Sequence, residues 1–354
     1  MDELAAARAE IDAVDEELAR LFCRRMDAVR AVAAYKQAHG LPVLDAGREE
    51  AVVAKNLAKL PDPAYAEYYE DFLRHNMALS RAMQTAFLGR GAVAYQGVEG
   101  AFSHIVLKTL YPHARALPFA TWAEVFDAVE AGRAAAGVLP FENSFAGDVS
   151  EVLDLCFAHP GVCVCGMYDL PVRQNLLGVP GATLSGVKRA VSHPQALRQS
   201  ERFLKSLSIE AQSCPNTAEA AKRVAEAGDA SLAAIASKET AALYGLEILA
   251  EDVNTSADNT TRFIVIGKEL AKEGDRFSLL FVVDHQPGTL AAVIRAIGEK
   301  GYNLECIKSR PHPGKPWEYY FYVEVVGGPG DVDALTGALA GLCRTVRVLG
   351  IYSR

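Results

Sequence analysis

Asp258-Asn259-Thr260-Thr261-Arg262-Phe263 is the stretch of sequence around which this chain is organised. The apolar, largely β-branched run that it opens, residues 263–266, predicts a buried strand. Side chains at the mouth of such a strand are held by a rigid scaffold and still face a cleft. Asn and Thr before a strand more often serve as turn or cap residues. The rest of the chain therefore decides what this stretch does.

Composition limits the classes of protein to which the chain can belong. Its 354 residues allow two or three domains, and half of them are hydrophobic, enough for each domain to bury a core. A net charge of −8 and a pI near 5.6 argue against nucleic acid or an anionic membrane as a partner. No apolar run approaches the roughly 18 residues of a membrane span. The seven scattered cysteines predict reduced thiols, and hence a cytoplasmic protein.

Residues 1–86 predict helices. From residue 2 to about residue 39 there is no proline or glycine, and Ala, Leu, Arg and Glu dominate. This helix would be about 55 Å long, more than a unit of this size can cover by itself, so we expect it to pair with a second copy of the chain. An apolar stripe along the helix predicts the contact face: Ile11, Val14, Leu18, Phe22, Val29 and Val32.

Two cations continue the apolar stripe of this helix. Arg25 and Lys36 are eleven residues apart, about three turns, and therefore share a face. Arg8 points about 100° away from Arg25 around the helix axis, so it cannot readily serve the same pocket from the same chain. Burying cations is costly unless an anion meets them. The alternative, a helical dimerisation module with solvated charges, stays open at this point.

Two shorter helices complete this part of the chain. Asp45 is expected to cap the second helix, with Arg48 and Glu49 in its first turn. The third helix, residues 64–85, places Asn76, Ser80 and Gln84 on one side at i, i+4 and i+8. Cations, carboxylates and neutral polar groups inside one bundle suit a small dianion that carries a hydroxyl group.

This ordered set of polar residues resembles the all-helical chorismate mutases over the whole of residues 1–86. The resemblance implies an intertwined dimer in which Arg8 reaches the partner's site. It also implies that the reaction is an intramolecular rearrangement, which requires no metal and no cofactor because the site only holds a compact conformer and stabilises developing charge. It assigns the carboxylates to Arg8 and Arg25, the ether oxygen to Lys36 and Gln84, the ring hydroxyl to Asp45 and Glu49, and a supporting role to Arg48 and Ser80.

Residues 92–268 alternate short strands with helices, which predicts a mostly parallel sheet covered on both faces. Polar loops follow the strands, where such folds bind ligands. Residues 96–103 (QGVEGAFS), 140–144 (PFENS) and 192–199 (SHPQALRQ) are loops of this kind. Any one of them is ordinary, but together with Thr261 they predict one cleft.

Together with residues 259–263 (NTTRF), these segments are similar to prephenate dehydratases over about 175 residues. The resemblance implies two lobes like those of periplasmic binding proteins, with the active site between them. Gln174 stands where the family usually has histidine. The implied main catalytic residue is Thr261, and the implied pocket residues are Glu142, Asn143, Ser144, Ser192, Gln199 and Arg262.

Residues 276–354 predict the order β-α-β-β-α-β of a ferredoxin-like fold, a separate sensor after a charged linker at 268–275. Residues 284–290 (DHQPGTL) and 303–304 (NL) resemble the ACT amino-acid-binding domains, and residues 308–311 (KSRP) resemble the phenylalanine-sensing version. A dimerising domain without ligand is the alternative. The effector residues that the resemblance implies are Gly288, Thr289, Leu290, Asn303, Ser309, Arg310 and Pro311.

Lys308 departs from this pattern, because the family usually has Glu at that position. A cation that touched the ammonium group of the effector would weaken binding, and Lys308→Glu would then tighten inhibition. Lys308 shares a strand face with Arg310, two residues on. The favoured prediction is therefore that Lys308 points to solvent and that Lys308→Glu is nearly neutral.

The sequence thus predicts three domains at 1–86, 92–268 and 276–354: an all-α bundle, a two-lobed α/β unit and an α+β sensor. The function implied is the conversion of chorismate to prephenate and of prephenate to phenylpyruvate, inhibited by phenylalanine, in a homo-oligomer of at least two chains. Two alternatives remain. One is a small-acid or amino-acid sensor without catalysis, and the other is a dehydratase whose helical part survives only to dimerise.

Overall fold

The computed structural model describes residues 2–39, 41, 44–87, 91–256 and 258–353. The chain divides into two compact units. One consists of residues 1–92 with 113–115, and the other contains residues 93–112 and 116–354. No helix in the described ranges is long and apolar enough to cross a membrane.

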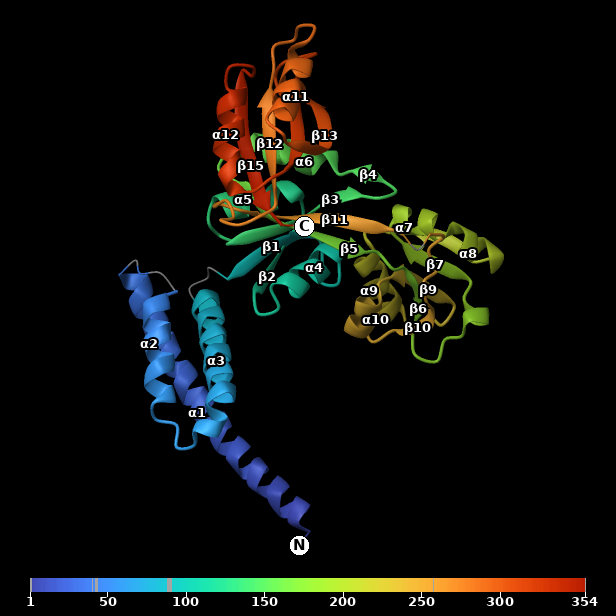
Figure 1. Cartoon of the computed structure of the whole chain (residues 1–354). Helices are drawn as coiled ribbons and strands as arrows, with labels where there is room; N and C mark the ends of the chain where they lie inside the picture. The colour runs from blue at the N-terminus through green and yellow to red at the C-terminus, as the bar shows by residue number, and fades with distance from the viewer. Residues whose placement is uncertain (1, 40, 42–43, 88–90, 257, 354) are drawn as a thin grey trace. The chain divides into compact units, whose positions relative to one another are not determined.

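The first unit is helical, as predicted. It contains α1 (Glu3–Ala38), α2 (Ala46–Leu57), a 3-10 turn (Pro63–Tyr65) and α3 (Ala66–Phe87), and α3 packs against both other helices (Figure 1). Asp45 is confirmed as the cap of α2, because its carboxylate accepts the backbone N–H of Arg48 at 2.9 Å. Such a cap satisfies one of the amides that a helix start leaves unpaired.

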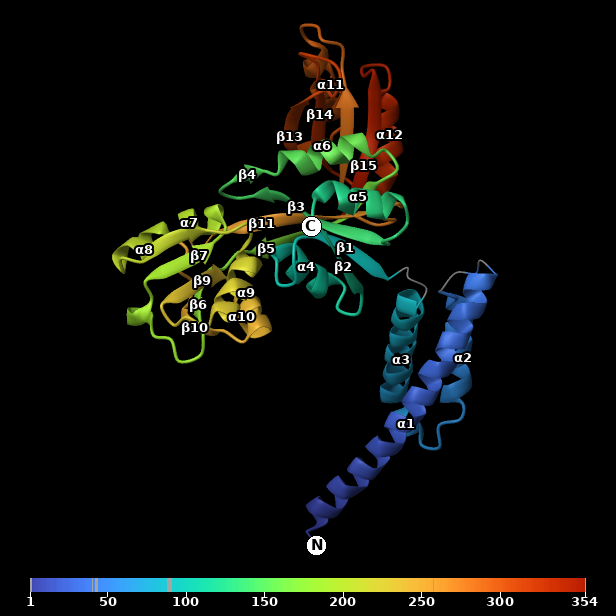
Figure 2. The same ribbon diagram turned by 180° about the vertical axis from the view of Figure 1, so that it is seen from behind.

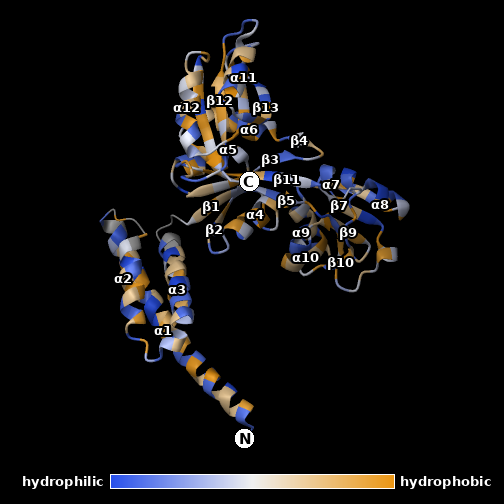
Figure 3. Ribbon diagram, viewed as in Figure 1, coloured by the Kyte–Doolittle hydropathy of each residue, from blue (hydrophilic) through white to orange (hydrophobic). Residues whose placement is uncertain are grey.

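The N-terminal half of α1 extends beyond α2 and α3 (Figures 1 and 2). Apolar residues recur along this extension (Figure 3). Most of the predicted contact stripe is exposed within one chain, with Ile11 at 58% and Leu18 at 43%, whereas Val29 is buried in the bundle.

The second unit begins with a lobe built on a mixed sheet. Its strands follow the order β5-β11-β3-β1-β2, with the short β4 paired to β3. The elements are β1 (Ala92–Gln96), α4 (Phe102–Leu110), β2 (Arg115–Phe119), α5 (Trp122–Glu130), β3 (Ala136–Asn143), β4 (Gly147–Asp148), α6 (Ser150–Ala158), β5 (Cys163–Pro171) and β11 (Thr260–Gly267).

β11 is the buried strand predicted from the opening stretch, and Phe263 and Ile266 are almost fully enclosed. It runs antiparallel to both neighbours, β3 and β5. The expectation of a mostly parallel sheet is therefore wrong for this central strand. β3 ends with Asn143 at the edge where β11 begins with Thr260, so the chain re-enters the lobe from that edge and must run the opposite way.

A second lobe follows β5 and is built on a five-stranded sheet in the order β10-β6-β9-β7-β8. The predicted helix after residue 194 is interrupted at Ser200, which ends α7 and precedes α8. The elements are β6 (Asn175–Gly178), a 3-10 turn (Leu184–Gly186), β7 (Arg189–Ser192), α7 (Pro194–Gln199), α8 (Glu201–Ser206), β8 (Glu210–Ser213), α9 (Thr217–Ala227), β9 (Leu232–Ala236), α10 (Lys238–Tyr244) and β10 (Glu247–Ala250).

The C-terminal region has the predicted β-α-β-β-α-β order. Its four strands lie in the order β13-β14-β12-β15. The elements are β12 (Arg276–Val282), α11 (Thr289–Glu299), β13 (Asn303–Pro311), β14 (Tyr319–Val326), α12 (Pro329–Leu339) and β15 (Thr345–Tyr352).

This region is joined to the first lobe and is not structurally separate from it. Gly350 of β15 pairs with Val164 of β5, which joins the two sheets edge to edge. One face of the C-terminal sheet also shares a hydrophobic core with the first lobe, where Tyr322 packs edge-on against Phe141 at 5.5 Å between ring centroids. Removing residues 276–354 would expose this core, so we expect truncation to destabilise the first lobe.

Candidate functional site

Thr261 lies where β11 meets β3, directly opposite Asn143. The side-chain amide of Asn143 donates to the Thr261 hydroxyl at 2.9 Å and to the side-chain oxygen of Asn259 at 2.8 Å. A hydroxyl has one hydrogen to donate and two lone pairs. Because Thr261 accepts from Asn143, its own hydrogen is left to donate to a bound molecule.

The orientation of Asn143 is fixed from both ends of its amide. Its side-chain oxygen accepts the backbone N–H of Ala146 at 2.9 Å and that of Phe145 at 3.1 Å. The amide of Gln195, from the second lobe, also approaches this oxygen at 3.5 Å. Two backbone donors on the oxygen and two side-chain acceptors on the nitrogen determine which way the amide faces.

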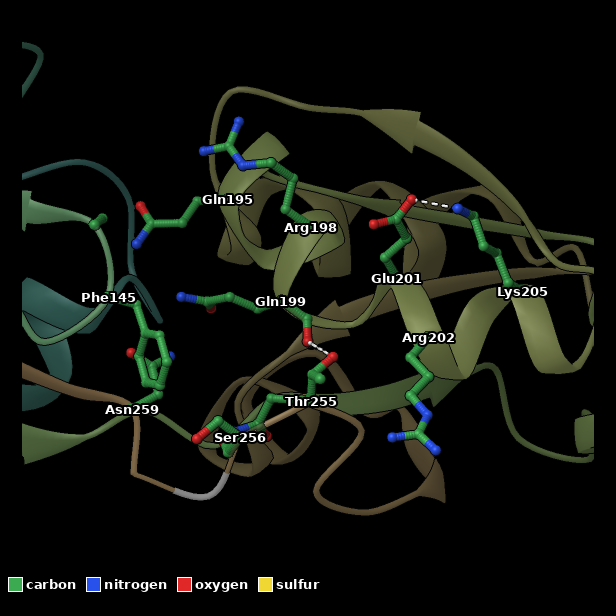
Figure 4. A pocket seen from close by; sticks show the side chains of 12 residues that line it. Phe145, Gln195, Arg198, Gln199, Glu201, Arg202, Lys205, Thr255, Ser256 and Asn259 are labelled. Carbon is green, nitrogen blue, oxygen red and sulfur yellow. Dashed lines mark hydrogen bonds and ion pairs between the residues drawn. The ribbon is translucent and has the colours of Figure 1, made fainter.

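A cavity of about 660 Å³ opens next to this arrangement, between the two lobes. Gln199 extends from α7 toward Phe145 and Gln195 (Figure 4). Asn259 is 2% exposed and lines the cavity, and its side-chain nitrogen has no hydrogen-bond partner in the described part of the chain. A buried amide without a partner is costly, so this nitrogen is an unsatisfied donor beside the cavity.

The wall formed by α7 and α8 is basic. Arg198, Arg202 and Lys205 all line the cavity, and Lys205 pairs with Glu201 at 2.6 Å. Neither arginine makes an ion pair with any residue that the structure describes. An apolar cavity with a few convergent polar groups and positive charge favours a small anionic ligand.

Glu142 and Arg262 do not face the same side as Asn143 and Thr261. Neighbouring residues on a strand point to opposite faces, and Glu142 and Arg262 pair with each other across the strands at 3.8 Å. Arg262 also pairs with Asp169 of β5 at 3.0 Å. The structure therefore places these two predicted pocket residues behind the cleft, where they support its floor.

The two predicted serines form hydrogen bonds with backbone groups of the protein. Ser192 is fully buried, and its hydroxyl donates to the carbonyl of Ile235 at 2.6 Å. The Ser144 hydroxyl accepts the N–H of Thr260 at 3.0 Å and donates to the carbonyl of Asp258 at 3.1 Å, so it fixes the start of β11.

The sequence reasoning missed several residues of the cavity. Asn259 and Gln195 stand inside the quoted NTTRF and SHPQALRQ segments, so each was adjacent to a predicted residue. Arg198 carried no signal beyond its neighbour Gln199, because an arginine on a short helix is usually solvated. His193 is the N-cap of α7. Its Nδ1 accepts the N–H of Gln195 at 3.2 Å, and burial, followed by the charge of Arg198, lowers its pKa.

The helical unit brings part of its predicted set together. Arg25 of α1 donates to the hydroxyl of Ser80 on α3 at 2.5 Å and to the carbonyl of Asn76 at 3.3 Å. Gln84, one turn further along α3, is 7% exposed, and its side-chain oxygen is buried with no partner among the described residues. Lys36 is half-buried in the last turn of α1.

The remaining predicted residues of this unit lie elsewhere. Glu49 pairs with Arg81 of α3 at 2.5 Å. Asp45 caps α2 and is exposed, as is Arg48. Arg8 lies on the extension of α1 and is exposed too. A single chain therefore assembles Arg25, Ser80 and Gln84 but leaves Arg8 without a neighbouring site.

A second cavity of about 660 Å³ lies in the C-terminal region. Gly288, Thr289 and Leu290 line it, as predicted. Gly288 has a φ of +88°, a conformation that suits glycine, and it precedes α11, whose N-terminus favours an anionic group. The other walls are formed mainly by residues 283–287 and by Ile294, Glu318, Tyr319 and Phe321.

The predicted residues of β13 divide between two faces. Ser309 lies opposite Phe321 and Pro311 opposite Tyr319, on the strand beside the cavity. Arg310 faces the other way and pairs with Asp154 of α6 at 2.5 Å. Asn303 begins β13 at the opposite end of the sheet, so the structure does not bring it to the cavity.

Comparison with known proteins shows which families this chain resembles. The chain matches the family models for chorismate mutase type II over residues 7–85, prephenate dehydratase over 93–271 and the ACT domain over 277–343. It is 31% identical to the bifunctional chorismate mutase/prephenate dehydratase of Aquifex aeolicus, covering 100% of this chain and 99% of that protein.

Two further proteins match most of the chain. An arogenate dehydratase/prephenate dehydratase of Arabidopsis thaliana is 33% identical, over 86% of this chain and 83% of that protein. A prephenate dehydratase of Arthrobacter aurescens, solved in complex with L-Phe, superposes with a TM-score of 0.68 at 27% identity, over 74% of this chain and 90% of that one.

Proposed function

The chain belongs to the family of bifunctional chorismate mutase/prephenate dehydratases, and we propose that it catalyses both reactions and is inhibited by phenylalanine. It converts chorismate to prephenate in the helical unit and prephenate to phenylpyruvate in the cleft between the two lobes. The observation that carries the proposal is the Thr261 hydroxyl, which accepts from Asn143 and so keeps its hydrogen for the substrate. Asn143 also donates to Asn259, which lines a basic cavity.

Dehydration of prephenate requires only a hydrogen-bond donor to the leaving group. The bond between the ring and its carboxylate breaks, the electron pair moves through the ring, and the hydroxyl departs from the opposite carbon. Formation of the aromatic ring supplies much of the driving force, so no strong acid is needed. Thr261, oriented by Asn143, donates to the departing oxygen, Asn259 orients the substrate, and Arg198 with Arg202 attracts its carboxylates.

The mutase reaction needs a shaped and charged pocket. Arg25, held by Ser80, binds a substrate carboxylate, and Lys36 with Gln84 stabilises negative charge on the ether oxygen as its bond to carbon breaks. Ser80 thus supports Arg25.

One assay tests the proposal and separates it from its alternatives. Purified full-length chain is given chorismate, and chorismate, prephenate and phenylpyruvate are followed in the same sample. We expect chorismate to be consumed, prephenate to form and then decline, and phenylpyruvate to accumulate. Phenylpyruvate from added prephenate but no loss of chorismate would mean that the helical unit only dimerises. No turnover of either substrate, with binding retained, would mean a sensor. Arogenate, offered in parallel, tests substrate choice in the cleft.

Phenylalanine binds the cavity next to Gly288 in this proposal. An effector acts through its different affinities for two states, so the ligand stabilises a less active arrangement of the lobes. We expect Ile294→Glu, which places a charge on the wall of this cavity, to raise the phenylalanine concentration for half-inhibition of phenylpyruvate formation at least about tenfold. Leu342→Glu, at a similarly exposed apolar position away from the cavity, should leave that concentration unchanged. Equal shifts would place the effector elsewhere.

A dimer completes the mutase site. The exposed stripe on the extension of α1 would be covered by the same helix of a second chain, and that helix would carry Arg8 into the neighbouring pocket. Mixing an Arg8→Ala chain with an Arg25→Ala chain should restore part of the lost mutase activity, because some mixed dimers regain one intact site. Equally inactive mixed and separate samples, once subunit exchange has been verified, would rule out a shared site. A cytoplasmic location stays a prediction from the reduced cysteines.

A further inference from the structure

Lys308 of β13 lies neither at the effector cavity nor in solvent. Its amino group donates to Glu142 at 3.1 Å and to Asp148 at 2.5 Å, and it lies 4.9 Å from the centre of the Phe141 ring. Its side chain is 8% exposed. The expectation that Lys308 points to solvent is therefore wrong. The face of β13 that it shares with Arg310 is turned toward the first lobe, which the sequence of β13 alone does not indicate.

The two partners of Lys308 belong to one hairpin. Glu142 on β3 lies opposite Asp148 on β4, and the next pair along is Asn143 opposite Gly147. The turn between them contains Phe145, which lines the substrate cavity and donates its N–H to Asn143. Lys308 thus contacts both strands of the hairpin one residue away from the amide that orients Thr261.

The charge of Lys308 is stabilised by the carboxylates of Glu142 and Asp148. Burial by itself would lower the pKa of Lys308, but the hydrogen bond to Asp148 and the nearby negative charges more than offset this and raise the pKa. Without the lysine, Glu142 and Asp148 would face each other with the more distant Arg262 as the remaining cation near Glu142. Like charges at this range repel, and solvent screens part of that repulsion because the side chains of Glu142 and Asp148 are 37% and 42% exposed.

We propose that Lys308 is a positioning residue of the dehydratase reaction: from the C-terminal domain it holds both strands of the β3–β4 hairpin and thereby keeps Asn143 in place to orient Thr261. This role rests on the dehydratase function proposed above. It also gives a chemical reason for a cation at a position where the family usually has an acid, because here the hairpin supplies the two carboxylates.

The test uses the full-length chain and measures kcat and KM for prephenate separately. We expect Lys308→Met to lower kcat about tenfold and to leave KM within about twofold, since a small misplacement of catalytic groups is felt mainly in the transition state. Lys308→Arg keeps the charge and should recover most of the rate. Mutase activity in the same samples should not change, because that site lies in the other unit.

Asp148→Asn weakens the same contact from the hairpin side and leaves the buried Lys308 in place. This variant therefore keeps the proposal testable if the Lys308→Met chain does not fold. It should lower kcat severalfold, and combining it with Lys308→Met should cost less than the product of the two single losses. Arg347→Met is the matched control. Arg347 is a half-buried cation at the same domain boundary, but it donates to the carbonyls of His159 and Val162 and does not touch the hairpin.

Three results would overturn the inference in an active wild-type chain: an unchanged kcat in folded Lys308→Met or Asp148→Asn, losses that multiply in the double variant, or an equal loss in Arg347→Met. A wild-type chain that forms no phenylpyruvate would instead refute the dehydratase function itself.

Discussion

Thr261→Val is expected to lower kcat for phenylpyruvate formation by at least about a hundredfold, the usual cost of removing a hydrogen-bond donor that acts on a leaving oxygen. Valine has nearly the shape of threonine, so the strand should keep its packing. Asn143 retains two other acceptors, the side chain of Asn259 and the carbonyl of Thr260, and should keep its orientation. The loss should therefore come from the missing hydroxyl. Steady-state kinetics with prephenate measures it.

Thr260→Val is the matched control for this prediction. Thr260 is the preceding residue of β11, so its side chain points to the opposite face, and the variant should keep most of the dehydratase rate. Thr261→Ser restores a hydroxyl and should recover part of the rate. Circular dichroism and the thermal unfolding of all three chains report whether they are folded. Equal losses in the two valine variants would mean that Thr261 has no special role.

Lys36→Ala is expected to have the second largest effect, a decrease of about a hundredfold or more in mutase kcat. In the proposed mechanism the ammonium group meets negative charge that exists only while the ether bond is breaking, so kcat should fall more than KM rises. The rate of prephenate dehydration should stay the same. Chorismate consumption, followed with an excess of substrate, measures the first quantity, and phenylpyruvate formation from added prephenate measures the second.

Arg30→Ala provides the comparison on the same helix. Arg30 is 59% exposed and lies 4.0 Å from Asp27, so its removal takes away a cation of α1 without touching the predicted pocket. A surface pair of this kind contributes little. If Arg30→Ala lowers the mutase rate as much as Lys36→Ala, the loss would reflect the overall charge of α1, and the assignment of Lys36 would be wrong.

Local patterns were enough to predict much of this fold. The run without glycine or proline, the apolar spacing on α1 and the capping carboxylate of Asp45 depend on neighbours a few residues away, and the structure contains each of them. The buried β11 and the β-α-β-β-α-β order of the C-terminal region are of the same kind. The segments around Thr261 also lie close together, because strand ends at one edge of a sheet converge.

The sequence by itself therefore determined most of the elements, their order and the residues that share a face. Only the tertiary structure decided what each face meets. Side chains on a strand alternate between its two faces, so Asn143 and Glu142 point to opposite faces and Lys308 and Arg310 share one. This alternation does not determine which face meets the cleft, the solvent or another domain. Those outcomes depend on pairings between residues more than a hundred positions apart, such as Asn143 with Thr261 and Lys308 with Glu142. No local pattern in the chain encodes such contacts, because their energy exists only once the sheets have assembled.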